Sequence, residues 1–531
     1  MSIDRTDPPQ QDPPDDRWRV TLRLPSFRQP SPAAAAAPGP RTPERAGRRL
    51  LALEAAGFLL VLAIAVAVRV TKLGTVPRII TADEADNLQT AYHIMAGTGP
   101  GFFNFDWKPA PIFSMYQLAW TMRIFGDTVS DFRLFPVILS MLTIIAFYFV
   151  ARRSLGPFAA LCGMALLATN LMFLHFSRTA WENTNAALFA LGACYATQRA
   201  LEQRTVGRAW AGWWALCGVF IALGLYGYFT GRFIFVAVFV IVLLAVALRQ
   251  APWREAFGGL VLAGVVSALL FAPMANEILD SWDYFNQRTR NVSVFEVRDE
   301  EPYEGDTDGW VIAAKNVVRN YQGFILQDGG QMHRGLWTRY NPAGRAPLDF
   351  IATHLFWAGL VVGVIRWRKT YTWWAFFAPL FIAETFSIGT PDLARGVIFA
   401  PFYFLFIGLL FEEALALTKR PETRYAAAAS IASVVAFVGI VNVVDYFEWQ
   451  DMRFTQLQRM PGIDPCEFGL WQKLAQNAAE AGPELASGDQ FDTARRELDC
   501  SDIVREAMGL PDTAEEAPAG PPLEGGSVPD G

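Results

Sequence analysis

Long apolar runs are the feature that most constrains how this chain folds. The first covers residues 50–70, and about ten more of similar length follow before residue 444. The later runs are residues 132–151, 157–175, 183–200, 210–229, 232–248, 257–276, 349–365, 371–388, 396–417 and 424–443. At 1.5 Å of rise per residue, about 20 apolar residues in an α-helix cross the hydrocarbon of a bilayer. Hydrophobic residues make up 52% of the chain and charged residues only 18%, which is too apolar for a soluble enzyme of 531 residues. The sequence therefore predicts an all-α polytopic membrane protein with about eleven transmembrane helices.

Basic residues occupy alternate loops between these runs. They precede the first run and follow the second, fourth, sixth, eighth and tenth. Because positively charged loops stay in the cytoplasm, we expect a cytoplasmic N-terminus and an exterior C-terminus. The same rule places the two longest loops, residues 71–131 and 277–348, on the exterior side.

The segments outside the runs differ in composition. Residues 1–46 are rich in proline, alanine and charge, which predicts a disordered cytoplasmic tail. We expect residues 47–443 to form the transmembrane domain, residues 444–510 a small exterior region, and residues 511–531 a disordered tail.

Charge and cysteine content exclude some classes of function. The formal net charge is -6, and the basic residues do not gather on one face, so no nucleic-acid partner is predicted. No Cys/His spacing resembles a zinc site, and no cofactor is implied, although the exterior carboxylates are of the type that binds divalent cations. Cys466 and Cys500 both follow the last run, and the sequence leaves open whether they form a disulfide.

An acidic cluster, residues 81–87, follows the first run directly. Thr81 and Glu84 have the spacing of a capping box, and apolar residues at helical spacing continue to about residue 95. A second amphipathic stretch covers about residues 112–125. We therefore expect two helices lying along the membrane surface within the first exterior loop.

Charged residues collect at the predicted exterior ends of the runs, whereas the centres of the runs carry almost none. This distribution is open to two interpretations, an ion pathway or an interfacial active site for an anionic lipid. An ion pathway would need charged residues inside the membrane. Because the centres of the runs carry almost none, the interfacial active site is the preferred interpretation. The charged residues are Asp83, Glu84, Lys108, Arg133, Arg178, Glu182, Arg232, Glu384, Asp392 and Arg395.

Five segments, in this order and on this side, resemble motifs of the GT-C superfamily of integral membrane glycosyltransferases. The branch is that of the protein O-mannosyltransferases and the aminoarabinose transferase that modifies lipid A, a glycosyltransferase family 39-like group. The segments are Asp83-Glu84-Ala85-Asp86-Asn87-Leu88, Lys108-Pro109-Ala110-Pro111, Asp131-Phe132-Arg133-Leu134-Phe135-Pro136, Ser177-Arg178 and Tyr226-Gly227-Tyr228-Phe229-Thr230-Gly231-Arg232. Ala110 and Glu182 depart from the family pattern, which leaves the donor contacts there open.

The resemblance implies a GT-C-like fold and an inverting hexosyl- or pentosyltransferase. Its donor would be a polyprenyl phosphate monosaccharide, and its acceptor a lipid, glycan or protein on the exterior face. Asp83 would then be the general base, with Glu84 orienting other residues. Lys108 would contact the donor phosphate. The weaker candidates for that contact are Arg133, Arg178, Arg232 and Arg395.

Each of these residues also has a purely structural interpretation. Asp83 and Glu84 stand where acids favour the start of a helix. Lys108 and the arginines would equally serve as anchors at the membrane interface. A transporter or flippase for a lipid-linked glycan is the competing class of function, and it predicts broken helices near mid-membrane and an internal repeat.

Overall fold

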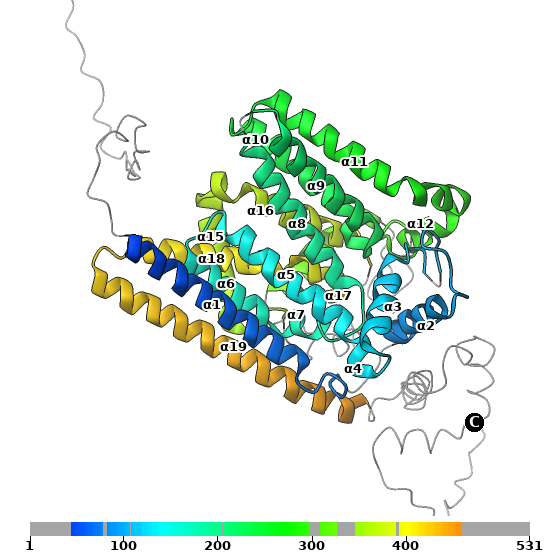
Figure 1. Cartoon of the computed structure of the whole chain (residues 1–531), viewed down its shortest axis with the longest axis horizontal. Helices are drawn as coiled ribbons and strands as arrows, with labels where there is room; N and C mark the ends of the chain where they lie inside the picture. Colours follow the sequence, from blue (N-terminus) through cyan, green and yellow to red (C-terminus); the bar gives the residue numbers. More distant parts are fainter. Residues whose placement is uncertain are drawn as a thin grey trace, which may run out of the picture. The chain divides into compact units, whose positions relative to one another are not determined.

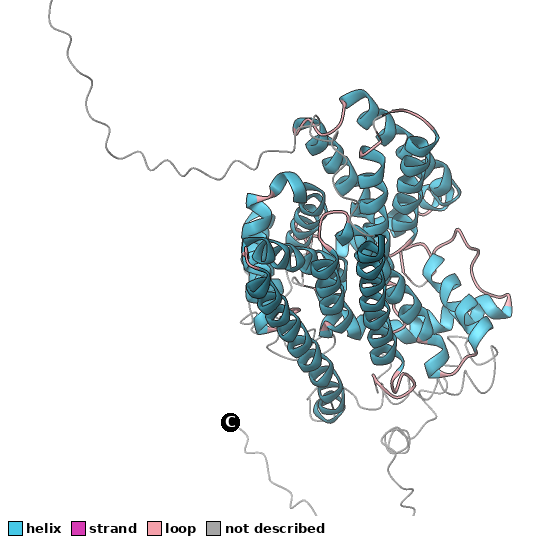
Figure 2. Ribbon diagram, turned by 60° about the vertical axis from the view of Figure 1, so that its left-hand side comes forward, coloured by secondary structure: helices cyan, strands magenta, loops and turns pink. Residues whose placement is uncertain are grey.

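The computed structural model describes residues 44–77, 82–106, 108–203, 205–296, 308–325, 346–388 and 392–457. The chain divides into two units, Met1–Leu53 and Glu54–Gly531, and the fold described below is that of the second. Its described residues form helices and connecting loops, without a strand longer than the isolated bridge between Ser293 and Ser387 (Figure 2).

The helices follow the predicted runs closely. In chain order they are α1 (Glu44–Val70), α2 (Ala82–Ala96), α3 (Phe113–Phe125), α4 (Val129–Phe132), α5 (Leu134–Arg152), α6 (Pro157–Thr169), α7 (Leu171–Phe176), α8 (Asn183–Leu201), α9 (Arg208–Tyr226), η2 (Phe229–Phe233), α10 (Ile234–Ala247), α11 (Trp253–Asp280), α12 (Trp282–Val292), α13 (Gly309–Ile325), α15 (Phe350–Ile365), α16 (Trp367–Thr385), α17 (Leu393–Gly396), η4 (Val397–Phe399), α18 (Ala400–Leu417) and α19 (Pro421–Leu457).

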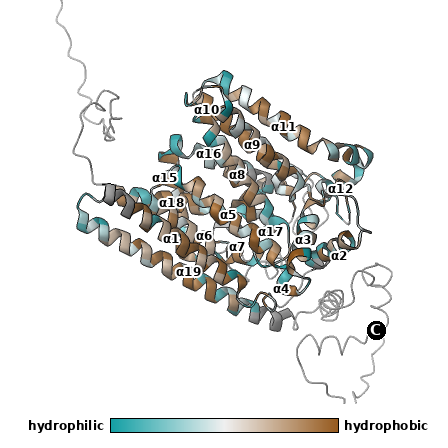
Figure 3. Ribbon diagram, viewed as in Figure 1, coloured by the Kyte–Doolittle hydropathy of each residue, from teal (hydrophilic) through white to brown (hydrophobic). Residues whose placement is uncertain are grey.

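Seven helical stretches in the described residues are long and apolar enough to cross a membrane. Two shorter apolar helices, α6 and α15, accompany them. Apolar residues run along α5, α9 and α11, and polar residues gather at the ends of these helices (Figure 3). The prediction of an all-α polytopic membrane protein is therefore confirmed. The count of about eleven spans stays a prediction, although a helix lies at each of the eleven predicted positions.

Residues at the helix starts explain several boundaries. Pro157 is the first residue of α6, where its missing N–H costs nothing. Asp349 caps α15 by accepting a hydrogen bond from the Ala352 N–H at 2.9 Å. The run predicted at residues 157–175 is instead broken at Asn170, whose side chain accepts from the Phe173 N–H at 3.0 Å and so starts α7. A polar residue inside an apolar run has here become a helix cap.

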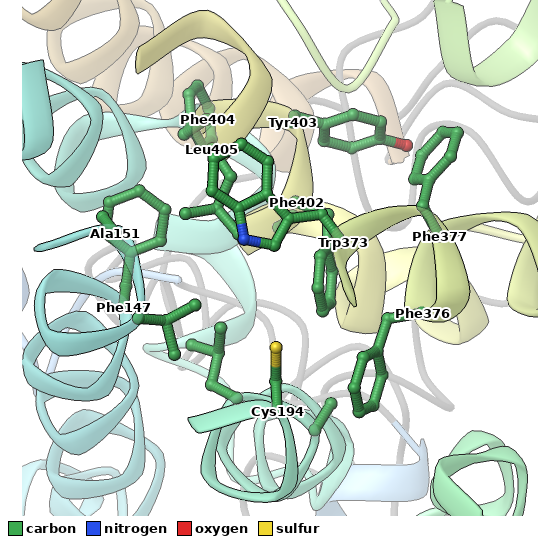
Figure 4. Packing of buried hydrophobic residues seen from close by; sticks show 14 of the residues in the cluster. Phe147, Ala151, Cys194, Trp373, Phe376, Phe377, Phe402, Tyr403, Phe404 and Leu405 are labelled. Atoms are coloured by element: carbon green, nitrogen blue, oxygen red, sulfur yellow. The ribbon is translucent and has the colours of Figure 1, made fainter. Parts of the chain in front are cut away.

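Aromatic side chains from several helices fill the centre of the bundle (Figure 4). Trp373 on α16 is fully buried, and Phe376 on the same helix stacks on Phe402 of α18 with ring centroids 5.4 Å apart. In α18 and the residues just before it, 89% of the apolar stretch is buried, so α18 is a central helix. Gly359 lets α15 approach it, because a Cβ there would lie 2.4 Å from the Phe406 carbonyl oxygen.

Loops predicted to lie on the same side of the membrane contact one another. If each span crosses the membrane in the direction opposite to the one before, alternate loops must lie at the same end of the bundle. The two sets of contacts define these two ends. The contacts are Arg153–Glu202, Gly156–Glu412 and Gln250–Arg368 at one end, and Asn183–Ala394 and Tyr284–Asp106 at the other. Which end faces the cytoplasm stays a prediction.

The first long loop contains the two predicted helices, α2 and α3, which pack against each other through apolar side chains (Figure 1). Trp120, Ile124 and Phe125 on α3 remain exposed, as expected for a helix at a membrane surface. Thr81 lies outside the described residues, and so does the predicted capping box. The same holds for residues 1–43 and 458–531, which include Cys466 and Cys500.

Candidate active site

Two carboxylates of the acidic cluster face the same way at the start of α2. Asp83 is the second residue of the helix, where the helix dipole favours negative charge, and Asp86 follows one turn later. Both side chains are half-buried. Burial raises the pKa of Asp86 to about 6, and the negative charges of Asp83 and Asp106 add to this while Lys108 opposes it. The site therefore holds three carboxylates within electrostatic reach of one ammonium group.

Lys108 is held in a hydrogen-bonded triad with Glu182 and Asn87. Its ammonium group forms an ion pair with Glu182 Oε1, and the two side chains are only 12% and 10% exposed. Asn87 Nδ2 donates to Glu182 Oε2 at 3.1 Å, and Asn87 Oδ1 accepts from Lys108 Nζ at 3.4 Å. Burial acts to raise the pKa of Glu182, but the charge and hydrogen bond of Lys108 bring it below its ordinary value. Glu182 is therefore an anion in this site.

Asp106 joins the loop after α2 to two helices. Its carboxylate accepts a hydrogen bond from the Thr90 hydroxyl on α2. Its backbone carbonyl accepts from the Tyr284 hydroxyl on α12 at 2.6 Å. The neighbouring Phe105 ring stacks on Phe285, also on α12, with centroids 5.8 Å apart. These contacts fix the acidic cluster against α12.

Glu84 and Arg133 are bonded to each other in a fully buried ion pair, each with 0% exposure. Arg133 Nε donates to Glu84 Oε1 at 3.0 Å, and Arg133 Nη1 donates to the Pro77 carbonyl at 2.7 Å. Glu84 Oε1 also accepts from the Ala180 N–H at 3.0 Å. The pair therefore joins α2, the start of α5 and the loop before α8.

Arg178 lies against the C-terminal end of α1 and is fully buried. Its Nη1 donates to the Val68 and Arg69 carbonyls at 2.7 Å each. Its Nη2 donates to the Thr71 and Val76 carbonyls at 2.7 and 2.8 Å. The last carbonyl groups of a helix have no hydrogen-bond donors within it, and they carry a partial negative charge. The Arg178 guanidinium donates to these carbonyls at the end of α1 and neutralises that charge.

Arg232 and Arg395 line one cavity of about 310 Å³. Its walls come from η2, the end of α12, the segment after α16, and η4. Arg395 forms ion pairs with Asp392 at 3.1 Å and Glu384 at 4.0 Å. The Arg232 guanidinium lies over the Phe285 ring at 4.3 Å, and its buried Nη2 has no hydrogen-bond partner among the described residues. The other lining residues are Tyr228, Phe229, Thr230, Phe233, Thr289, Val292, Ser293, Phe386, Ser387, Ile398 and Phe399.

Two short links connect this cavity to the acidic cluster. Phe285 contacts both Arg232 and Phe105, the residue before Asp106. Asn183, the residue after Glu182, donates to the Ala394 carbonyl at 2.8 Å, next to Arg395. The acidic cluster and the cavity therefore belong to the same end of the bundle.

The predicted site residues thus fall into three groups. Asp83 belongs to the acidic cluster and Lys108 lies beside it, whereas Arg232 and Arg395 line the cavity. Glu84, Arg133 and Arg178 are buried among partners inside the protein. In the described part of the chain, no three His, Cys, Asp or Glu side chains are grouped so that they could hold a metal ion.

Sequence reasoning did not assign Asp86, Asp106 and Asn87 to the site. The i, i+3 spacing of Asp83 and Asp86 was a usable signal, because such residues share a helix face. Asp106 and Asn87 carried no comparable signal, since their partners are 16 and 95 residues away in sequence.

Replacing Asp86 by Asn should make the protein more stable at neutral pH. The pKa of Asp86 is 3.8 in the unfolded chain and about 6 in the folded protein, so the folded protein holds the proton more tightly. The stability that this provides is fully present below pH 3.8 and is lost as the pH rises through about 6, because the charged carboxylate is disfavoured in the folded protein. After allowance for solvent screening, we expect a gain of about 1 kcal/mol at pH 7.5. Thermal unfolding in detergent at pH 7.5 and pH 4 measures it, with a difference expected only at the higher pH. Equal stability of the two proteins at both values would contradict the environment described for Asp86.

Part of the chain matches a known protein family. Residues 109–276 match the family described as dolichyl-phosphate-mannose-protein mannosyltransferase. The matched stretch contains Arg133, Arg178 and Arg232 and begins one residue after Lys108. None of the curated proteins compared with the chain matches it.

Solved structures of membrane glycosyltransferases are similar to the chain. The archaeal oligosaccharyltransferase AglB from Archaeoglobus fulgidus, in complex with an inhibitory peptide and a dolichol-phosphate, is 14% identical with a TM-score of 0.52, and the alignment covers 84% of this chain and 60% of that one. ArnT from Cupriavidus metallidurans in the apo state is 15% identical with a TM-score of 0.49, covering 87% of this chain and 75% of that one. The chain thus spans about three fifths of the AglB chain, and the similarity to AglB shows a shared fold.

The family match and the shared fold confirm the resemblance seen in the sequence. This chain is an all-α polytopic membrane protein that shares its fold with the oligosaccharyltransferase AglB, and its residues 109–276 match the dolichyl-phosphate-mannose-protein mannosyltransferases.

Proposed function

We propose that this protein transfers a monosaccharide from a polyprenyl phosphate donor to an acceptor, with inversion at the anomeric carbon. One observation carries the proposal. A half-buried cluster of carboxylates with a lysine lies at the same end of the bundle as a largely apolar cavity, and this cavity is lined by Arg232, whose Nη2 has no hydrogen-bond partner among the described residues. The carboxylates provide a proton acceptor, and the cavity suits an anion attached to an apolar chain.

The environment of Arg232 supports a lipid phosphate as the ligand. A cation shielded from water is costly unless an anion pairs with it, and among the described residues the Arg232 guanidinium lies over aromatic rings while its Nη2 has no hydrogen-bond partner. Apolar side chains such as Phe229, Phe233 and Ile398 line the rest of the cavity. A polyprenyl phosphate supplies both the missing charge and the apolar body. AglB, which has the same fold, was solved with a dolichol-phosphate bound.

The residue types in the acidic cluster suit the chemistry of the transfer. The acceptor group must lose a proton as it attacks the anomeric carbon, and Asp83 is the proposed base. The lipid phosphate is the leaving group, so its growing negative charge needs cations rather than a proton donor. Lys108 and Arg232 are the proposed cations, and Arg395 would assist them. Glu84, Arg133 and Arg178 would position the first loop and need not touch either substrate.

The distribution of basic loops supports a site on the exterior face, with the N-terminus in the cytoplasm. The acceptor would then be a lipid, glycan or protein outside the membrane. A transporter or flippase is less well supported, because α11 and α16 each contain a proline and still run without interruption. The break at Asn170, six residues before the end of α7, is a feature that the transporter interpretation would also predict.

Sugar transfer itself tests the proposal. Membranes containing the protein would be incubated with a panel of radiolabelled polyprenyl phosphate monosaccharides, and the labelled product would be identified. We expect one donor to be consumed and its sugar to appear on an acceptor. Movement of an intact labelled donor across vesicle membranes without bond cleavage would favour the transporter and overturn the transferase.

Replacing Arg232 by Leu should weaken donor binding. We expect the donor KM to rise about tenfold to a hundredfold with a smaller change in kcat, because the apolar cavity remains while its charged partner for the phosphate is lost. The matched control is Arg254→Leu, since Arg254 also lies over an aromatic ring, that of Trp253 at 5.4 Å, but lines no part of the cavity. An unchanged KM in the Arg232 variant would remove the cavity from the donor site.

A further inference from the structure

We infer that Glu182 is the internal counter-ion of Lys108 and thereby limits how tightly the site holds the donor phosphate. This inference rests on the proposed function and concerns the same site. It assigns a carboxylate outside the first exterior loop to the control of donor affinity, through the ammonium group that the phosphate also needs.

The geometry makes the ion pair a fixed part of the site. Glu182 uses both oxygens, with Oε1 paired to Lys108 and Oε2 accepting from Asn87 Nδ2 at 3.1 Å. Asn87 Nδ2 also donates to the Ala180 carbonyl at 3.1 Å. The three side chains of the triad thus contact one another, and Asn87 ties them to the chain segment that carries Glu182.

The backbone around Glu182 is held on both sides. The Ala180 N–H donates to the buried Glu84 at 3.0 Å, and the Asn183 side chain donates to the Ala394 carbonyl at 2.8 Å. The carboxylate is therefore presented from a restrained segment. It cannot follow the lysine freely when a ligand approaches.

Glu182 and a bound phosphate would both be anions that pair with the ammonium group of Lys108, so they compete for it. Lys108 already faces the acidic side of α2, where its charge lowers the pKa of Asp86 while Asp83 and Asp106 raise it. A phosphate that reaches Lys108 would enter a site with four nearby carboxylates and share the ammonium with one of them. Removing the charge of Glu182 should therefore strengthen phosphate binding by about tenfold, the effect of one charge at close range in a partly screened site.

A merely structural carboxylate would behave in the opposite way. If Glu182 served only to hold Lys108 in position, its loss would misplace the ammonium and weaken binding. The Glu182→Gln variant separates the two roles, because Gln keeps the size of the side chain and one oxygen that can still accept from Asn87, while it loses the charge and the second acceptor.

The experiment measures binding of undecaprenyl phosphate to the full chain in detergent, for the wild type and the Glu182→Gln variant. We expect about tenfold tighter binding and a lower donor KM in the variant. The control is Glu413→Gln, which removes a carboxylate that pairs with Arg366 at 2.8 Å at the other end of the bundle and should leave affinity unchanged. Equal or weaker binding by Glu182→Gln overturns the inference.

A second measurement does not depend on any ligand. The labelling of Lys108 by an amine-reactive reagent, followed by mass spectrometry, reports how firmly the ion pair with Glu182 holds the amino group. Lys108 should be labelled faster in the Glu182→Gln variant, because the carboxylate that holds it is lost. An unchanged labelling rate overturns the counter-ion role by itself. Faster labelling, with no undecaprenyl phosphate bound by either protein, overturns the proposed phosphate site and with it the link between Glu182 and affinity.

Discussion

Replacement of Asp83 by Asn is expected to lower kcat for sugar transfer by about 10²–10⁴-fold while leaving donor binding nearly unchanged. Asn keeps the shape of the side chain and its position at the start of α2, but it cannot accept the acceptor's proton. The measurement is a single-turnover assay with saturating labelled donor, together with donor affinity and thermal stability of the same variant. The loss should appear in the chemical step alone.

The control for this experiment is Asp283→Asn on α12. The Asp283 side chain is 91% exposed and, among the residues that the structure describes, forms an ion pair with Arg290 alone at 3.3 Å, so its replacement removes an acid from the same end of the bundle without entering the site. It should retain full turnover. Wild-type turnover in the Asp83 variant would refute the base assignment, and Asp86, one turn away with a pKa raised to about 6, would become the next candidate.

The second large effect is expected at the buried ion pair of Glu84 and Arg133. Breaking a pair whose members are both at 0% exposure leaves an uncompensated charge inside the protein. We expect Arg133→Met to destabilise the fold by about 3–5 kcal/mol. Thermal unfolding of purified variants in detergent provides the comparison with the wild type.

The double variant Glu84→Met/Arg133→Met serves as the internal control. It removes both charges together, so it should recover most of the stability lost in the single variant. A Glu84→Gln variant separates this positioning role from a direct role of Glu84 in the reaction. Wild-type stability combined with lost transfer in that variant would show that Glu84 acts in the reaction, and the positioning role proposed for it would then fail.

The sequence predicted the helices well because membrane helices depend on local composition. The apolar runs, their lengths and the basic loops between them are all short-range signals, and a helix lies at each predicted position. The break at Asn170 escaped prediction because it depends on partners that the run itself does not contain, including the Pro347 carbonyl, which accepts from Asn170 Nδ2 at 2.8 Å.

The arginines show where sequence reasoning about the site stops. Arg133, Arg178 and Arg232 all stand at predicted exterior ends of runs, and nothing in their local sequence separates them. Their environments differ only in the fold: Arg133 has a carboxylate partner, Arg178 has four backbone carbonyls, and Arg232 faces a cavity. Which cation is free to meet a substrate is decided by contacts between segments far apart in sequence.

Arg178 and Arg133 have a consequence for how this protein can vary. Between them they hold residues 68–77 through carbonyl oxygens of the main chain, which every amino acid possesses. The exposed positions Lys72, Gly74 and Thr75 contribute no side chain to this attachment. Residues 68–77 are therefore sensitive to a change of length, and side-chain changes at Gly74 and Thr75 should have little effect. Insertions and deletions there would displace Asp83, whereas changes of side chain at those two positions would leave it in place.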